Sequence, residues 1–183
     1  MKKFLTFLAT AAMMISFSAC GGDDDGGDGG EDKANYAKIG TTTHDLKEAK
    51  CWWWTTGIEG IYGFDIYFYD EENVFDRATG ITNGEYDGLN INAYTFYCNT
   101  PTPKSGTYTI LGDDDDVADL KHSGWLDHIN NNKTGTWDEG RISTLSINNL
   151  GNDIYEFSIS GKAGDGTTPI EMYYKGKVWF FED

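Results

Sequence analysis

A two-residue alternation of apolar side chains, plainest over residues 61–69, is the feature that most constrains the fold of this chain. One side of this run carries Tyr62, Phe64, Ile66 and Phe68, and the other carries Asp65, Tyr67 and Tyr69. Successive side chains of a β-strand point to opposite faces, so the pattern predicts a strand with one face in a core. We assign the first set to that core.

Similar short runs rich in aromatic and β-branched residues alternate with Gly, Asn and Asp along the rest of the chain, which is typical of hairpins. Helical periodicity is nearly absent. Strands are predicted over residues 36–39, 43–46, 51–55, 61–69, 89–98, 105–111, 141–148, 153–160, 170–174 and 177–181. Other expectations are a polar link over 47–50, a long loop or weak hairpin over 70–88, a short helix from Asp113 to Leu120, and an irregular polar stretch over 122–140.

The number and order of these strands predict the fold class. About nine or ten short strands without a crossover helix favour an all-β antiparallel β-sandwich, with an up-and-down β-barrel as the alternative. The last four strands, joined by short turns, are expected to form a meander with a turn at Gly176. We expect residues 34–183 to form a single β-domain, which is long enough to bury a core.

The start of the chain has the parts of a secretory signal: a basic N-terminus, an apolar run over residues 4–17, and small residues before Cys20. The run is too short to span a membrane, which takes about 20 residues. The cysteine after the small pair resembles the lipobox of bacterial lipoproteins, although Phe17 stands where that pattern most often has Leu. The resemblance implies a signal peptide over residues 1–19 and an acylated Cys20 that anchors the protein stably in a membrane.

A Gly- and Asp-rich stretch follows Cys20, and its composition cannot bury apolar area. We expect residues 20–33 to be the acylated cysteine and a disordered tether. An acidic run close behind a lipidated cysteine resembles the surface-export signal of Bacteroidetes lipoproteins, although two glycines precede the acids here. A plain flexible tether is the alternative. The predicted location is therefore the outer membrane, with the domain exposed on the cell surface.

Three pieces of the domain stand out as turn and strand signals: KIGTTTHDL at 38–46, PKSGTY at 103–108, and residues 140–179 with DIYEF and YKGK. Together they are similar to small lipoproteins that are widespread in gut Bacteroidetes. The match covers most of residues 36–182 and consists of turn and strand signals. It implies a surface lipoprotein of unassigned function with a β-sandwich fold, and it carries no catalytic residues to transfer.

The net charge of the chain disfavours two classes of binding partner. The chain has 14 Lys and Arg against 30 Asp and Glu, a net charge of −16. So acidic a surface repels nucleic acid and anionic lipid headgroups, which makes both poor partners. The expected contact with a membrane is through the lipid anchor alone.

Two cysteines remain once Cys20 is acylated, and an exported chain folds in an oxidising compartment. Cys51 and Cys98 could therefore form one disulfide, provided that their Cα atoms lie within about 7 Å. Two buried free thiols are the other expectation.

A search for catalytic motifs finds no nucleophile elbow, zinc-protease helix motif, phosphate-binding loop or dinucleotide fingerprint, so we name no catalytic residue and no cofactor. His122, Asp127 and His128 are a weak candidate metal site, for which solvent-facing loop histidines are the alternative. The acidic run 113–116 fails the calcium-loop template, and a solvated turn or helix start is expected there.

Aromatic residues are the best functional indication. Trp52, Trp53 and Trp54 are consecutive, and Tyr67 and Tyr69 stand opposite the assigned core face. Exposed aromatic rings stack on sugars, while packing in the core is the alternative for each. We therefore predict a non-enzymatic binding or interaction module with a polysaccharide or an envelope protein as partner. The rival functions are a hydrolase using two carboxylates and a structural envelope or assembly subunit.

Overall fold

The computed structural model describes residues 33–84, 86, 88–112, 116–130 and 136–183, with the backbone alone for Tyr94, 127–130 and 136–138. The chain divides into Met1–Asp32 and a compact unit, Lys33–Asp183. The predicted signal peptide, Cys20 and most of the predicted tether lie outside the described residues, as does the acidic run 113–115. Within the described part, no helix is long and apolar enough to cross a bilayer.

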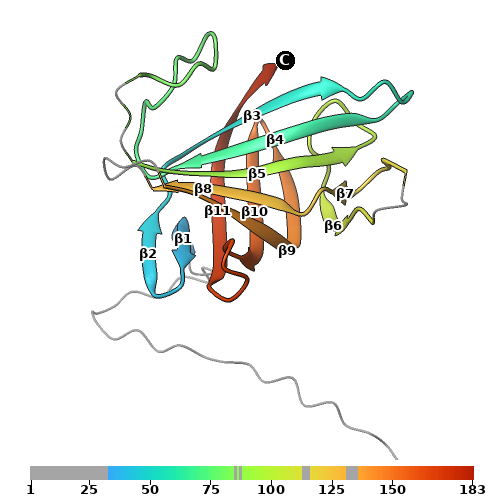
Figure 1. Ribbon diagram of the computed structural model, residues 1–183. Coiled ribbons are helices and arrows are strands. Elements are labelled where there is room, and N and C mark those ends of the chain that lie inside the picture. The colour runs from blue at the N-terminus through green and yellow to red at the C-terminus, as the bar shows by residue number, and fades with distance from the viewer. Residues whose placement is uncertain (1–32, 85, 87, 113–115, 131–135) are drawn as a thin grey trace, which may run out of the picture. The chain divides into compact units, whose positions relative to one another are not determined.

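The described chain consists of strands and their connections, with no helix (Figure 1). The strands are β1 (Tyr36–Ile39), β2 (Thr42–Asp45), β3 (Glu48–Thr55), β4 (Tyr62–Tyr69), β5 (Leu89–Cys98), β6 (Gly106–Ile110), β7 (Lys121–His122), β8 (Trp125–Asn130), β9 (Thr136–Gly151), β10 (Ile154–Lys162) and β11 (Pro169–Glu182).

These strands close into a β-barrel. Hydrogen bonding runs through β3, β4, β5, β7, β6, β9, β10 and β11, and β11 returns to β3. β8 joins β5 to β9 along another part of their length, and the β1–β2 hairpin adds to β11. In Figure 1, β3, β4 and β5 pass on one side of the barrel, and β9, β10 and β11 pass on the other. The all-β prediction is confirmed in the form of its alternative, the barrel.

The length of β11 explains why the chain forms a barrel and not two separate sheets. β11 pairs with β10 up to residue 177 and with β3 from Val178 onward, so it links the two ends of the sheet. The β11–β3 pairing is parallel, as is β6–β7, which departs from a purely up-and-down order. Gly176, where we expected a turn, lies inside β11. It pairs with Tyr155, and a Cβ there would stand 2.9 Å from the Tyr174 hydroxyl oxygen.

The barrel interior is packed with side chains. On β4 the predicted alternation is confirmed, because Phe64, Ile66 and Phe68 are all fully buried. The rings of Phe64 and Phe96 stack with centroids 5.3 Å apart. Residues of every long strand complete this core, among them Ile91, Leu126, Leu145, Phe157 and Met172.

A β-bulge on β5 changes which residues face the interior. Register shifts opposite Asp65, and Thr95 adopts a φ of 44°. The Thr95 N–H donates to the Asp65 carboxylate at 2.6 Å, which holds the bulge. Beyond it, Phe96 and Cys98 are buried. From the sequence we expected the alternation to run unbroken through residues 89–98, with Leu89, Thr95 and Tyr97 on one face; that expectation is wrong past the bulge.

Two further expectations are wrong. The stretch at 122–140 was expected to be irregular, but it contains β8 and the start of β9, which pair with each other. In the predicted helix from Asp113 to Leu120, the described residues 116–120 are not helical. Polar composition misled in the first case, because one face of a barrel strand faces solvent.

A second apolar cluster lies on the outer face of β3 and β4, covered by residues 70–88. It contains Tyr69, Val74 and Phe75, with Trp179 and Phe181 packed against them. Among the described residues of segment 70–88, the β-pairing is an isolated bridge, Phe75–Thr82, consistent with the expected loop or weak hairpin. The expected polar link at 47–50 instead enters β3, where Glu48 and Lys50 are each 4% exposed.

Candidate functional site

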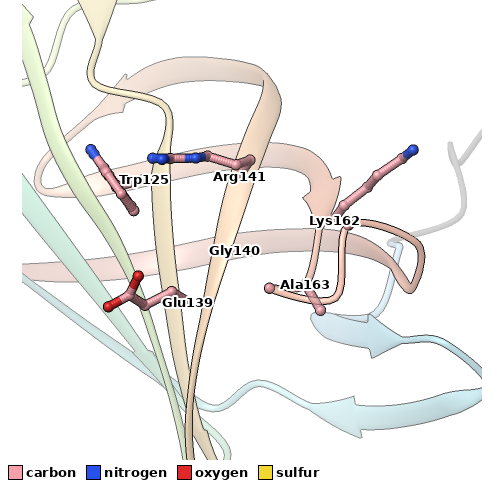
Figure 2. Close-up of a pocket in the computed structure, with 8 residues that line it drawn as sticks. Trp125, Glu139, Gly140, Arg141, Lys162 and Ala163 are labelled. Carbon is pink, nitrogen blue, oxygen red and sulfur yellow. The ribbon is translucent and has the colours of Figure 1, made fainter.

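A shallow hollow of about 290 Å³ lies where β8, β9 and β10 meet the turn that follows β10. It is lined by Trp125, Glu139, Gly140, Arg141, Lys162, Ala163, Gly164 and Gly166. We call it the Trp125 hollow. Figure 2 shows the Arg141 side chain reaching toward Trp125, with Glu139 on the same side and Lys162 extending the opposite way.

Strand register brings these residues together. Trp125 on β8 pairs with Arg141 on β9, and Arg141 pairs with Lys162 on β10, so one row crosses three strands. Glycines permit the close approach. A Cβ on Gly161 would stand 2.1 Å from the Arg141 carbonyl oxygen, and one on Gly140 would stand 2.6 Å from that of Lys162. The register also shifts between Ser160 and Gly161, which bends the strand at this point.

Trp125 and Arg141 form the centre of the hollow. The guanidinium carbon of Arg141 lies 3.1 Å from the centroid of the Trp125 ring. Trp125 is 41% exposed, the only tryptophan among the exposed large apolar residues of the described chain. Among the described side chains, Arg141 has no hydrogen-bond or ion-pair partner, and its own side chain is exposed.

The chemistry of the Trp125 hollow suits binding of a polar ring. An indole face accepts the apolar C–H face of a sugar, and a planar guanidinium presents several N–H donors to its oxygens. Glu139 adds an acceptor for hydroxyl groups. It is the one carboxylate among the described lining residues, whereas glycoside hydrolysis commonly uses two that flank the bond.

The tryptophan run divides between the two sides of the sheet. Trp53 is partly buried against the main core, with its ring centroid 6.1 Å from that of Tyr62. Trp52 points outward and contacts Phe181, with centroids 5.4 Å apart. Trp54 also points outward, and its indole covers Gly63, where a Cβ would stand 2.5 Å from the ring. All three are partly exposed, so neither of the two expectations for them accounts for the whole run.

The two candidate tyrosines lie under segment 70–88. Tyr69 is fully buried, and Tyr67 is partly buried against the same cluster. The Lys50 ammonium lies 5.2 Å from the Tyr67 ring centroid and 5.6 Å from that of Tyr69. In this structure Tyr69 is therefore covered by the chain itself and presents no platform to a ligand.

The two cysteines of the domain are free and buried. The disulfide that we considered is therefore absent, and the alternative of two free thiols holds. Cys51 on β3 lies opposite Ile66 of β4, and Cys98 on β5 lies opposite Tyr62 of β4. The two cysteines are therefore on strands separated by β4, at positions four residues apart along it. An offset of four residues is roughly 13 Å along a strand, which exceeds the span of a disulfide. Burial raises the pKa of the Cys51 thiol well above its ordinary value.

The candidate metal site is not assembled among the described side chains. His122 on β7 is 1% exposed, and burial lowers its pKa. The backbones of Asp127 and His128 lie on β8, while their side chains are outside the described residues. No group of three potential ligands occurs in the part of the chain that the structure describes. His122 therefore does not face solvent as a loop histidine would.

The residues of the Trp125 hollow were not among the sequence candidates. Trp125 was the visible signal, since a tryptophan in a polar stretch has few apolar neighbours in sequence to explain it. Arg141 and Lys162 gave no signal, because their approach depends on the pairing of three strands.

Comparisons with known proteins identify no relative: no family model, curated protein or solved structure matches this chain.

Proposed function

We propose that this protein is a non-enzymatic module that binds glycan in the Trp125 hollow. The observation that carries the proposal is the pair formed by the exposed Trp125 ring and the Arg141 guanidinium, which has no acidic partner among the described residues. A sugar ring stacks on the free part of the indole, and Arg141 and Glu139 hydrogen-bond to its hydroxyl groups. The hollow is shallow, so it accommodates a unit within a longer chain.

The proposed location on the cell surface would bring such a module into contact with extracellular polysaccharides. An acylated Cys20 and an acidic tether hold the domain at the outer membrane, where it faces polysaccharides outside the cell. The net charge of −16 argues against nucleic acid as a partner. We propose accordingly that the membrane is contacted through the lipid anchor and that the partner is a polysaccharide.

Affinity gel electrophoresis of the purified chain tests the proposal. Gels contain neutral polysaccharides in turn: a glucan, a galactan, a mannan and a xylan. We expect retention by at least one of them, and we expect Trp125→Ala to weaken binding roughly tenfold or more, since stacked aromatics dominate such contacts.

The matched control is Ile110→Ala, which removes another exposed apolar side chain, 57% exposed, outside the hollow. It should migrate like the unmodified protein. Absence of retention on every gel, or equal retention by Trp125→Ala, would overturn the proposal.

A further inference from the structure

A second hollow, of about 360 Å³, lies beside the start of β3, the middle of β11 and segment 70–88. We call it the Trp179 hollow. The residues that matter here are Asn35, Lys47, Arg77, Lys175, Lys177 and Trp179.

The residues that line the Trp179 hollow carry a net positive charge, whereas the whole chain is strongly negative. Four lining residues are basic and two, Glu48 and Glu72, are acidic, which leaves a net charge of +2 (four minus two). The whole chain has 14 basic and 30 acidic residues. Cations that gather in one place repel each other, and an anion bound among them relieves that repulsion.

The cations are held in place by the fold. The Arg77 guanidinium carbon lies 4.1 Å from the Trp179 ring centroid, and the Lys177 ammonium lies 4.2 Å from the same centroid. Arg77 also pairs with Glu48 at 2.5 Å. Because the carboxylate of Glu48 accepts from Arg77 and from the Val74 N–H, its charge is already compensated within the protein.

The remaining cations lie on elements that hydrogen bonds fix. The Asn35 side chain accepts from the Lys175 N–H at 2.6 Å and donates to the Lys175 carbonyl oxygen at 3.2 Å. The Lys47 N–H donates to the Tyr69 carbonyl oxygen at 2.8 Å. Lys47 and Lys177 have exposed side chains, so they reach the hollow without burial of their charge.

We infer that the Trp179 hollow binds the anionic groups, carboxylate or sulfate, of an acidic glycan. This inference rests on the proposed function for the class of ligand but uses other residues. Trp179 serves as a support for cations and not as a sugar platform, because its ring is partly buried and two cations, Arg77 and Lys177, contact it, whereas among the described residues a single cation contacts the exposed ring of Trp125. The ligand is a glycan and not a lipid surface, since a broad membrane face would meet the net negative charge of the chain.

Binding of the purified chain to polygalacturonate, dextran sulfate and neutral dextran tests the inference by calorimetry. We expect one or both polyanions to bind, with an affinity that falls as salt rises. The double variant Lys47→Gln/Lys177→Gln should weaken that binding roughly tenfold. The charge-matched control, Lys38→Gln/Lys121→Gln, lies outside both hollows and should bind like the unmodified protein.

Unchanged polyanion binding by Lys47→Gln/Lys177→Gln would overturn the inference, as would binding to phosphatidylglycerol vesicles with none to either polyanion. The two proposals fail separately. If Trp125→Ala changes nothing while the double lysine variant loses polyanion binding, the Trp125 hollow is refuted and the Trp179 hollow stands. The reverse pattern refutes the Trp179 hollow alone.

Discussion

Two hollows on one barrel each place an arginine against a tryptophan, and they differ in what holds the arginine. In the Trp179 hollow, Arg77 pairs with Glu48, a carboxylate that is 4% exposed. In the Trp125 hollow, Arg141 has no acidic partner among the described residues. The same pair of side chains is thus tied to a buried carboxylate in one place and, among the described residues, to none in the other. The difference lies in the covering segment, since residues 70–88 bury one outer face and leave the other bare.

The outer face of β3 that segment 70–88 covers carries two buried charged side chains, Glu48 and Lys50, which solvent would reach if that segment were absent. Glu48 and Lys50 both point to the outer face of β3, where segment 70–88 supplies their partners. Lys50 donates to the Gly80 carbonyl oxygen at 2.8 Å and to the Thr82 hydroxyl at 2.9 Å. Its ammonium also lies 5.3 Å from the Phe75 ring centroid. The covering segment is therefore held by specific polar contacts as well as by its apolar cluster.

The largest expected effect on stability comes from breaking the contacts that hold segment 70–88 on β3. Glu48→Ala removes the acceptor of the buried Val74 N–H and the ion-pair partner of Arg77. Losing one member of a buried charged network costs about 3 kcal/mol of the free energy of unfolding. Urea denaturation measures it, with Glu72→Ala, an exposed acid in the same hollow, as a control expected within about 0.5 kcal/mol. Equal stabilities of the two variants would show that segment 70–88 does not depend on this contact.

A smaller effect comes from pH. Burial lowers the pKa of Lys50 to about 8, while nearby Glu48 opposes that shift. The unfolded chain keeps this lysine protonated to about pH 10.4, so between the two values it binds more protons than the folded protein does. The contribution of Lys50 to the free energy of unfolding therefore rises with pH across this window.

The comparison of the protein with Lys50→Met isolates that contribution. From about pH 7.5 to 9, the stability of the protein relative to the variant should increase by about 1 kcal/mol. Chemical denaturation at several pH values measures the change. Ile81→Met, which replaces an exposed side chain without an ionisable group, provides the control and should show no such trend. A flat difference for Lys50→Met would mean that the ammonium remains hydrated beneath segment 70–88.

Much of the barrel was predictable from local pattern. β1 and β5 have the predicted bounds, and the core face of β4 followed from alternation alone. The bulge at Thr95 was not predictable, because it depends on a carboxylate from the neighbouring strand. The closing contact of β11 with β3 joins segments about 130 residues apart, and no local signal encodes it.

The sites were less predictable than the fold, for a related reason. An aromatic residue opposite a core face is exposed only if no other segment covers it. Tyr69 is covered by residues 70–88, and Trp125 is not, although both lie on barrel strands. Sequence pattern therefore located faces correctly on β4 but did not reveal which outer face the loop would bury.

The smallest expected effect on stability is the sharpest test of the difference between the two arginines. Arg141→Gln removes a contact with an exposed ring and leaves no buried charge behind, so the free energy of unfolding should change by less than about 0.5 kcal/mol. Arg77→Gln leaves the buried Glu48 without its cation and should cost roughly 1–2 kcal/mol, less than loss of the carboxylate because the Val74 N–H remains paired. Parallel urea titrations measure both, and equal losses would contradict the contrast. If the contrast holds, Arg141→Gln keeps the fold intact, so any loss of glycan binding by that variant can be assigned to the Trp125 hollow itself and not to unfolding.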